Sequence, residues 1–315
     1  MGKKHKKEEE LARSSVHYKQ SFGDRVISVI TYIVYSIFAF VCLYPFYYIF
    51  INSISNNQLS ERGKVIIIPL EVHFQNYASV MKLDGLFQAA KVSVCRTVIG
   101  TAMVVLSSAF LGYMFTRDTM WGRKFWFRIV AATMYFNAGV IPLYITMNNL
   151  HLTNNFWVYI LPMAISPFHM ILCKTFIEQI PGELSDAASI DGAGTLRIFF
   201  NIMIPVIKPI VATVAIFSAV TQWNSFQDTL LYITDRKLYT LQFVLYQYIN
   251  QASSIKALLN GTSGGANIAA SMAKMQTATS IRMTVTIVVV APILLVYPFF
   301  QKYFTKGIMI GAVKG

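Results

Sequence analysis

The chain has 315 residues, of which 55% are hydrophobic and only 13% are charged, and its formal net charge is +13. Soluble domains carry about 25% charged residues, so this composition excludes an ordinary soluble globular protein and indicates contact with lipid. A basic excess can also indicate nucleic-acid binding. Here the basic residues flank apolar runs, where attraction to anionic lipid accounts for them, and we expect no nucleic-acid partner.

Six apolar runs follow one another along the chain, and each is a candidate transmembrane helix. They cover residues 26–51, 97–116, 129–147, 156–173, 210–220 and 283–300. About 20 apolar residues cross a bilayer core. The fifth run reaches that length only if it begins near Ile204 and tolerates Pro205, Lys208 and Pro209 at its start. The sequence therefore predicts an all-α integral membrane protein with six transmembrane helices.

The distribution of lysine and arginine predicts the orientation of these helices. Residues 1–22 form a basic tail, the connection after the second run is also basic, and the connection over residues 148–155 carries neither lysine nor arginine. Basic flanks stay on the cytoplasmic side. We therefore expect cytoplasmic termini, a membrane domain over 23–315, a cytoplasmic region at about 177–205 and a large outer loop at about 223–280.

Several smaller signals complete this outline. Cys42, Cys95 and Cys173 lie within or at the ends of apolar runs, and three scattered thiols form neither a metal site nor a disulfide framework. The β-branched run "GKVIIIP" predicts a short strand at 63–69. The large outer loop combines an amphipathic stretch, "LQFVLYQYINQ", with the small-residue stretch "NGTSGGANIAAS".

The cytoplasmic stretch "DAASIDGAGTLRIFFNIMIP", residues 186–205, predicts two short helices separated by a turn. Glu183 and Asp186 lie near the start of the first helix, where the helix dipole favours acids. Leu184, Ala187 and Ala188 are expected to share its apolar face.

The turn and the second helix follow from the next residues. Gly192 is placed to end the first helix in a left-handed turn, and Thr195 is placed to cap the second. An apolar stripe is then expected on the second helix. It comprises Leu196, Phe199, Phe200 and Met203.

Two interpretations of this helix pair remain open. An amphipathic hairpin could lie on the lipid headgroups, but such helices favour lysine and arginine on their polar face. The polar residues of the first helix are instead acidic, namely Glu178, Glu183, Asp186 and Asp191. The acidic face favours docking onto a cytoplasmic protein.

The same stretch resembles a known signature. It contains, in order, Asp186, Ala187, Ala188, Gly192, Ile202 and Pro205. This order resembles the "EAA…G…I.LP" signature of membrane subunits of ABC importers, with aspartate in place of the usual glutamate and Ile204 at the leucine position. The fuller string resembles the carbohydrate importers of the maltose type. "NAGVIPLYITMNNLHLTNNFWVYILP", "TQWNSFQDTLLYITDRKLYTLQ" and "FQKYFTKGIMIGAVKG" resemble the lipoprotein or polysaccharide permease branch of Gram-positive bacteria, so the resemblance covers nearly the whole chain.

The resemblance implies the type I ABC importer permease fold and a coupling helix that seats in a cleft of an ATP-hydrolysing subunit. The coupling residues it implies are Glu183, Asp186, Ala187, Ala188, Asp191, Gly192, Ile202 and Pro205. Within this set, Asp186 would contact the ATPase, Ala187 and Ala188 would permit close approach, and Asp191 would pin the turn at Gly192.

The resemblance also implies the partners and the location. They are a second homologous permease subunit, two ATP-binding subunits, an extracellular lipid-anchored sugar-binding protein and the lipid of a bacterial cell membrane. The chain contains no G-x-x-x-x-G-K-[ST] phosphate loop. We therefore expect no cofactor or metal in this chain, ATP and Mg²⁺ in the partner subunits, and no enzymatic activity of its own. The implied cargo is an oligosaccharide or a polysaccharide fragment.

Four residues are candidates for the substrate pathway because sugars favour aromatic faces and amide groups. They are Asn137, Trp223, Asn224 and Gln227. Helix packing and interface anchoring are the alternative roles. Arg96 either snorkels outward or lines a cavity, and His169 is expected to form a hydrogen bond between helices.

Other functions weighed against an oligosaccharide importer are an ABC permease for a peptide, a lipid-like substrate or a metal ion, a secondary transporter or channel, and a membrane enzyme. A secondary transporter or channel needs ionisable relays or a filter, and the runs and their edges offer only Arg96, His169 and the edge residue Lys174. No run carries the paired His/Asp/Glu constellation of a membrane enzyme.

Overall fold

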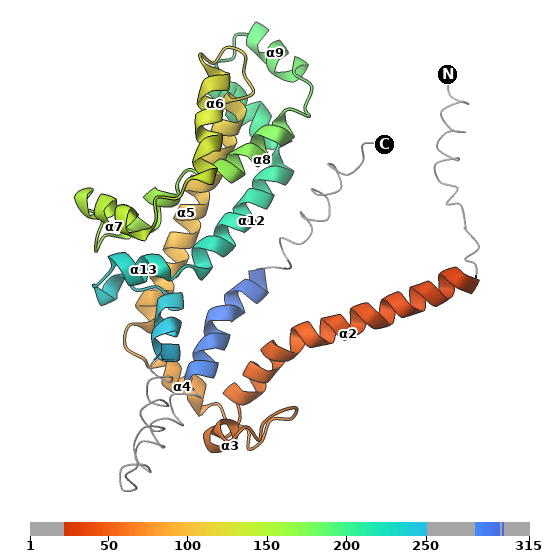
Figure 1. Cartoon of the computed structure of the whole chain (residues 1–315), viewed down its shortest axis with the longest axis vertical. Coiled ribbons are helices and arrows are strands. Elements are labelled where there is room, and N and C mark those ends of the chain that lie inside the picture. Colours follow the sequence, from red (N-terminus) through yellow and green to blue (C-terminus); the bar gives the residue numbers. More distant parts are fainter. Residues whose placement is uncertain (1–21, 251–280, 297, 299–315) are drawn as a thin grey trace. The chain divides into compact units, whose positions relative to one another are not determined.

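The structure, a computed structural model, describes residues 22–250, 281–296 and 298, and every regular element in these ranges is a helix (Figure 1). The chain divides into two compact units, Met1–Ile49 and Phe50–Gly315. The first unit holds most of α2 (Phe22–Ser53), a helix of 32 residues that contains an 18-residue stretch with mean hydropathy 2.4. At about 1.5 Å per residue, α2 exceeds the thickness of a bilayer core. It confirms the first predicted span. The basic tail lies outside the described residues, apart from Phe22.

The second unit is built around α5 (Leu86–Met114), which packs against α8 (Pro167–Ile177) and α12 (Lys208–Asn224) (Figure 1). The contact between α5 and α8 is close, since a Cβ atom added at Gly112 would lie 2.9 Å from the Cβ of Cys173. Small residues permit such approach between membrane helices. The second span was predicted at 97–116, and its helix begins earlier, at Leu86.

The third predicted span is not one continuous helix. It consists of α6 (Arg123–Ala132) with the turn η1 (Thr133–Tyr135), and then α7 (Val140–Asn149), bent by 119°. The bend has a local cause. Gly139 has φ +84°, and the side-chain oxygen of Asn137 accepts a hydrogen bond from the Gly139 amide at 2.9 Å. An asparagine that bonds the backbone two residues on makes a turn that competes with the helix.

Two more predicted spans are bent. The fourth combines η2 (Phe156–Tyr159) and η3 (Leu161–Met163) with α8 at 47°. The fifth joins α10 (Thr195–Ile198), the π-helical turn η4 (Phe199–Met203) and α11 (Ile204–Val206) to α12 at 85°. The expected start near Ile204 is wrong, because helical structure runs from Thr195 through Val206 and the helix after the bend begins at Lys208. Pro205 and Pro209 are tolerated, as predicted, because both occupy first-turn positions.

Length and composition allow up to five spans in the described residues, two as continuous helices and three as bent pairs. The sixth predicted span corresponds to a shorter apolar helix, Ile281–Val296. The rest of that predicted span, apart from Pro298, lies outside the described residues. The chain is thus an all-helical membrane protein.

Short helices complete the second unit. They are α3 (Asn57–Glu61), α4 (Gln75–Met81), α9 (Glu183–Ile190), α13 (Gln227–Tyr232), η5 (Arg236–Leu238) and a helix over residues 241–250. The first part of the predicted outer loop is therefore largely helical, and "NGTSGGANIAAS" lies outside the described residues.

The predicted strand at 63–69 is wrong, because this segment consists of turns and bends. An extended run pairs its backbone groups only beside a second strand, and the described ranges contain no strand.

Candidate functional site

The turn that ends α9 is the best-defined feature of the predicted coupling region. Gly192 has φ +79°, as predicted. Its amide donates to the Ser189 carbonyl at 3.1 Å, and the Ala193 amide donates to the Ala188 carbonyl at 3.0 Å. These two bonds form a Schellman motif, which closes a helix through a left-handed residue. Asp191 occupies the C-cap position, so α9 has a fixed end.

The face of α9 that packs inward is made by small residues. Ser185 and Ala188 are buried, and the Ser185 hydroxyl lies 3.8 Å from the Met203 sulfur. Leu184 and Ala187, predicted on this face with Ala188, are exposed. The prediction failed for these two because so short a helix contacts its neighbour through a single i, i+3 pair. Ser185 and Ala188 form that pair, since their small side chains allow the closest approach.

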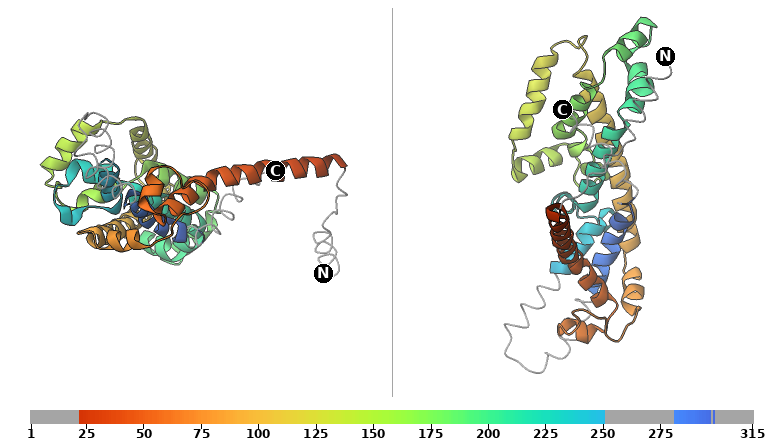
Figure 2. Two further views of the ribbon diagram at one scale, coloured as in Figure 1. Left: turned by 90° about the horizontal axis from the view of Figure 1, so that it is seen from below. Right: turned by 90° about the vertical axis from the view of Figure 1, so that its right-hand side faces the viewer.

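The outward face of α9 combines acids with apolar side chains. Glu183, Asp186 and Asp191 are exposed, and the Ile190 side chain is 87% exposed. α9 lies at the end of the second unit where α5 finishes, well away from the start of α5 (Figure 1, Figure 2). Acid, apolar and small groups on one accessible helix provide a surface suited to a protein partner.

The second helix of the pair differs from prediction in two ways. Gly194 is its N-cap, and Thr195 is its first helical residue without a capping bond. The inward stripe comprises Ile198, Phe199 and Met203, whereas the predicted Leu196 and Phe200 are exposed. The cause is the π-helical turn η4, whose i→i+5 pairing rotates the following residues away from α-helical register.

The inward stripe joins one hydrophobic cluster with the ends of α5 and α8. The cluster includes Tyr113, Cys173, Ile177, Ala188, Ile198, Phe199, Met203 and Ile207. Ile202 packs against it and is half-buried, while Pro205 is exposed. The cluster places α9 in direct contact with the helices at the centre of the second unit.

Arg117, three residues beyond the end of α5, adds a polar link to α9. Its guanidinium lies 3.9 Å from the Asp186 carboxylate and 3.4 Å from the Ser189 hydroxyl. The Asp186 side chain is 74% exposed, so this ion pair is weak and leaves the carboxylate accessible. Both residues border a cavity of about 400 Å³ beneath α9, which is also lined by Glu178 and Met203.

The four substrate-pathway candidates occupy two places. Asn137 forms the α6–α7 turn described above. The Trp223 indole donates to the Val289 carbonyl at 3.1 Å, and the Asn224 side chain accepts from Gln242 at 3.1 Å. Gln227 is exposed at the start of α13. No hydrogen bond among the described residues joins any two of the four candidates.

A buried charged cluster was not predicted from the sequence. The Arg96 side chain is fully buried and is ion-paired with Asp228. It also donates to the Gln222 side-chain oxygen at 3.1 Å and lies 4.4 Å above the Tyr159 ring. Arg96 therefore neither snorkels nor lines an open cavity. The only sequence signal was an arginine at the edge of an apolar run, and its partners are remote in sequence.

His169 also departs from expectation. Its ring stacks on Phe217 with centroids 6.3 Å apart. Its Nδ1 atom is buried and has no hydrogen-bond partner among the described residues, so the predicted bond between helices is not found at this atom. Within the described ranges, no group of three or more His, Cys, Asp or Glu residues could hold a metal ion.

The continuous and bent spans define the class as a helical membrane protein, and comparison with known proteins gives the family. The model of the family described as "Binding-protein-dependent transport system inner membrane component" matches residues 12–310. The chain belongs to this family. It is therefore a permease subunit of an ABC importer, a multi-pass component of the inner (cytoplasmic) membrane that transports without being catalytic itself and needs no cofactor. Membership implies ATPase subunits and a binding protein as partners.

Individual relatives agree over most of their length. The chain is 34% identical over 292 residues to the polygalacturonan/rhamnogalacturonan transport system permease protein YtcP of Bacillus subtilis (strain 168), covering 93% of this chain and 99% of YtcP. It is 35% identical over 279 residues to Protein LplC of the same organism, covering 87% of this chain and 90% of LplC.

A solved structure shows the same fold. It is the crystal structure of a bacterial ABC transporter involved in the import of the acidic polysaccharide alginate. The TM-score is 0.78 at 27% identity, and the match covers 90% of this chain and 98% of that chain.

Proposed function

We propose that this chain is one of two membrane subunits of an importer for an oligosaccharide or a polysaccharide fragment, and that α9 is its coupling helix. The observation that carries the proposal is the arrangement of α9. Its acidic and apolar face is exposed, while Ser185 and Ala188 seat it on the same cluster that holds the ends of α5 and α8.

This arrangement suits the transmission of force. Closely packed interiors move as units because small gaps forfeit contact energy. A displacement of α9 is therefore passed through Ala188 and Met203 to the ends of α5 and α8. The Schellman turn at Gly192 keeps α9 at a fixed angle to α10. The exposed side chains Asp186 and Ile190 are the proposed contacts to the ATPase.

The proposed assembly contains a second permease subunit of the same family, two ATP-binding subunits and a lipid-anchored extracellular binding protein. Both termini are placed in the cytoplasm. The support for this orientation is the basic character of residues 1–22 and of the connection from Arg117 to Arg128, set against the lack of lysine and arginine in residues 148–155.

The sugar cargo is proposed from the similar proteins. YtcP is named for polygalacturonan/rhamnogalacturonan transport, and the matching structure is that of a transporter involved in the import of alginate. Among the pathway candidates, we propose that Asn224 and Gln227 contact the sugar, since both lie at the junction of α12 and α13, with Gln227 at the start of α13. Asn137 and Trp223 have structural roles instead, since Asn137 shapes the α6–α7 turn and Trp223 is hydrogen-bonded to the Val289 carbonyl.

The coupling role can be tested by cross-linking. In a variant lacking Cys42, Cys95 and Cys173, a cysteine at Ile190 should cross-link to an ATP-binding subunit. A cysteine at Phe74, also exposed but in the segment assigned to the outside, should not. Equal cross-linking at both positions, or none at Ile190, would refute the coupling role.

The cargo can be tested with the reconstituted transporter. ATP turnover should rise when its binding protein is loaded with an oligosaccharide. Stimulation by peptides alone would overturn the sugar assignment while leaving the coupling role intact.

A further inference from the structure

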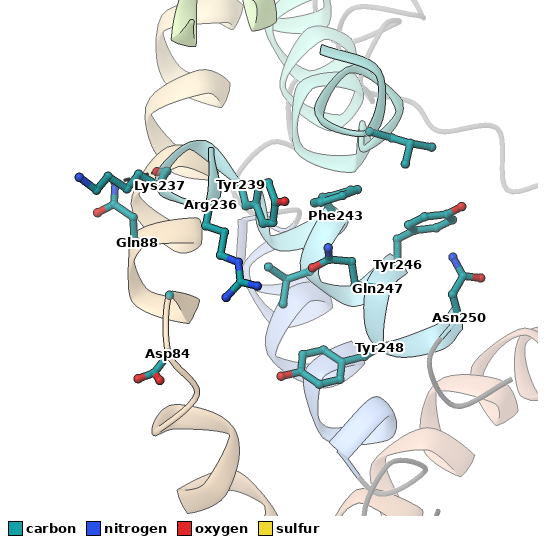
Figure 3. Close-up of a pocket in the computed structure, with 13 residues that line it drawn as sticks. Asp84, Gln88, Arg236, Lys237, Tyr239, Phe243, Tyr246, Gln247, Tyr248 and Asn250 are labelled. Atoms are coloured by element: carbon teal, nitrogen blue, oxygen red, sulfur yellow. Dashed lines mark hydrogen bonds between the residues drawn. The ribbon is translucent and has the colours of Figure 1, made fainter. Parts of the chain in front are cut away.

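An open cavity of about 890 Å³ lies between the start of α5 and the segment over residues 236–250. Figure 3 shows its lining, with Gln88 and Asp84 on one side and Tyr239, Gln247 and Tyr248 on the other. The volume falls within the range of about 300–1,000 Å³ typical of small-molecule sites. The proposed topology places this cavity on the outer face.

Arg236 is the charged group directed into this cavity. Its guanidinium points toward Gln247 and Tyr248, whereas the Lys237 side chain runs away from it beside Gln88 (Figure 3). Arg236 is exposed, and none of the ion pairs found among the described residues involves it. A free guanidinium in a concave site can bind a carboxylate through two parallel hydrogen bonds.

The backbone around Arg236 is held rigidly. The Asp235 side chain accepts from the Lys237 amide at 2.9 Å, Gln88 donates to the Lys237 carbonyl at 3.0 Å, and the Tyr159 hydroxyl donates to the Leu238 carbonyl at 2.7 Å. These bonds fix η5 to α5 and η2. A side chain on a fixed backbone loses less freedom when it binds a ligand.

The rest of the lining suits a sugar ring. Tyr239 and Phe243 contact each other edge-to-face with centroids 4.7 Å apart, and Tyr248, Gln247 and Asn250 lie further along the same segment. Aromatic side chains offer an apolar face with a polar handle, and amides pair with hydroxyls. Asp84 can accept hydrogen bonds from further hydroxyls.

The charge balance favours a particular acid. The lining carries two cations, Arg236 and Lys237, and one acid, Asp84. Because only the Arg236 guanidinium is directed inward (Figure 3), the cavity lacks the excess of positive charge that would favour a doubly charged phosphate. The single carboxylate of a sugar acid can pair with Arg236, while its hydroxyl groups can donate to Asp84 and pair with the amides.

We propose that this cavity is a binding site for a uronate-type unit, that is, a sugar carrying a carboxylate, with Arg236 as the carboxylate-binding residue. The inference rests on the proposed sugar-import function and adds the chemical class of the cargo and a point of contact on this subunit.

The test measures direct binding to the complete membrane complex, purified without its binding protein so that only sites on the complex contribute. Trigalacturonate is the acidic probe and maltotriose the neutral one, with binding followed by saturation-transfer NMR titration. Arg236→Gln should weaken trigalacturonate binding by about tenfold, the loss expected of one charged contact. The neighbouring cation provides a matched control, and Lys237→Gln should change binding less than about twofold, since its charge faces away. Maltotriose binding should respond to neither change.

Equal losses of trigalacturonate affinity in the two variants would indicate non-specific attraction by surface charge and overturn the proposal. Unchanged trigalacturonate binding in Arg236→Gln would also overturn it. If Arg236→Gln instead weakens only the binding of the sugar-free binding protein, the cavity is a protein-docking site and the proposal is wrong. The proposed function is tested separately by saccharide-stimulated ATP turnover. If Arg236→Gln loses the preference for acidic saccharides but keeps ATP turnover stimulated by neutral ones, the proposal is supported. If ATP turnover does not respond to any saccharide, the sugar-import function is contradicted, and the binding result is unaffected.

Discussion

The guanidinium of Arg96 on α5 is ion-paired with the carboxylate of Asp228 on α13, 132 positions away in the chain. The side chains are 1% and 11% exposed. A buried charge is stable only when it is paired and hydrogen-bonded, and Gln222 and the Ser225 carbonyl supply the remaining acceptors. The pair therefore fixes α13 against α5 and against the end of α12.

Removing one member of this pair should be costly. Asp228→Asn leaves the Arg96 cation buried without a counter-charge, and breaking such a pair costs about 3–5 kcal/mol. We expect a large fall in thermal unfolding temperature of the purified complex. The double variant Arg96→Gln/Asp228→Asn should be less destabilised than Asp228→Asn alone, because no charge remains buried.

The more exposed i, i+4 pair Lys174–Glu178 provides the control for that experiment. Glu178→Gln should cost less than about 1 kcal/mol, since water solvates Lys174 after the change. Equal effects of Asp228→Asn and Glu178→Gln would show that burial does not decide the energetics of the Arg96 pair.

Gly192 allows a similarly matched comparison. A Cβ atom there would meet nothing within 4 Å, so the cost of Gly192→Ala comes from its positive φ alone, about 1 kcal/mol or more. Gly194 also has open space around a Cβ atom, but its φ is −68°. Gly194→Ala should cost less than Gly192→Ala, because its only penalty is that alanine is a poorer N-cap than glycine. Thermal unfolding of both variants measures strain in the turn, and co-purification of the ATPase measures crowding at the partner surface.

The features that were predictable from sequence are local ones. Gly192 followed a helical pattern in the position of a left-handed end, and the prolines at 205 and 209 fell where a helix can begin. Apolar run length located the spans, because the bilayer sets a fixed requirement. Each of these depends on a few neighbouring residues.

The features that were missed depend on tertiary contacts or on competition between signals. Which face of α9 packs inward depends on the fit of Ser185 against Met203, and hydropathy alone favoured Leu184. The π-helical turn η4 has no clear sequence mark. The bend at Asn137 and Gly139 did have a turn signal, which the surrounding apolar run concealed. Nothing near Arg96 in sequence indicated Asp228.

Trp223 can be assigned a structural or a transport role by a conservative change. Trp223→Phe keeps an aromatic ring and removes the hydrogen bond from Nε1 to the Val289 carbonyl. We expect a loss of about 1 kcal/mol in stability, with the apparent affinity for saccharide unchanged in vesicle uptake. A large change in apparent affinity at normal stability would place the indole in direct contact with the sugar.

The orientation in the membrane can be tested by labelling. In a background without Cys42, Cys95 and Cys173, single cysteines at Asn149 and Gly182 both occupy exposed positions. An impermeant maleimide applied to whole cells should label position 149 and spare position 182, and permeabilised cells should label both. Labelling at 182 in sealed cells would reverse the proposed topology.

The proposed coupling contact of Asp186 gives the most direct functional prediction. Asp186→Lys replaces an accessible acid on α9 with a cation, so a charged contact to the ATPase becomes a repulsion of about 1–3 kcal/mol. The fold should survive, because the Asp186–Arg117 separation is 3.9 Å and the carboxylate is mostly solvated. We expect normal membrane insertion, reduced co-purification of the ATPase, and loss of saccharide-stimulated ATP turnover in reconstituted vesicles.

The matched control for Asp186→Lys is Asp186→Glu, which keeps the charge and lengthens the side chain by one methylene group. Since position 186 is exposed and the cavity beneath α9 leaves room for the longer arm, this variant should retain both ATPase binding and stimulated turnover. A loss of both in Asp186→Glu would show that arm length, and not charge, governs the contact. Normal ATPase binding and normal stimulated turnover in Asp186→Lys would mean that α9 does not couple through this residue, because a reversed charge at a seated contact must lower the affinity.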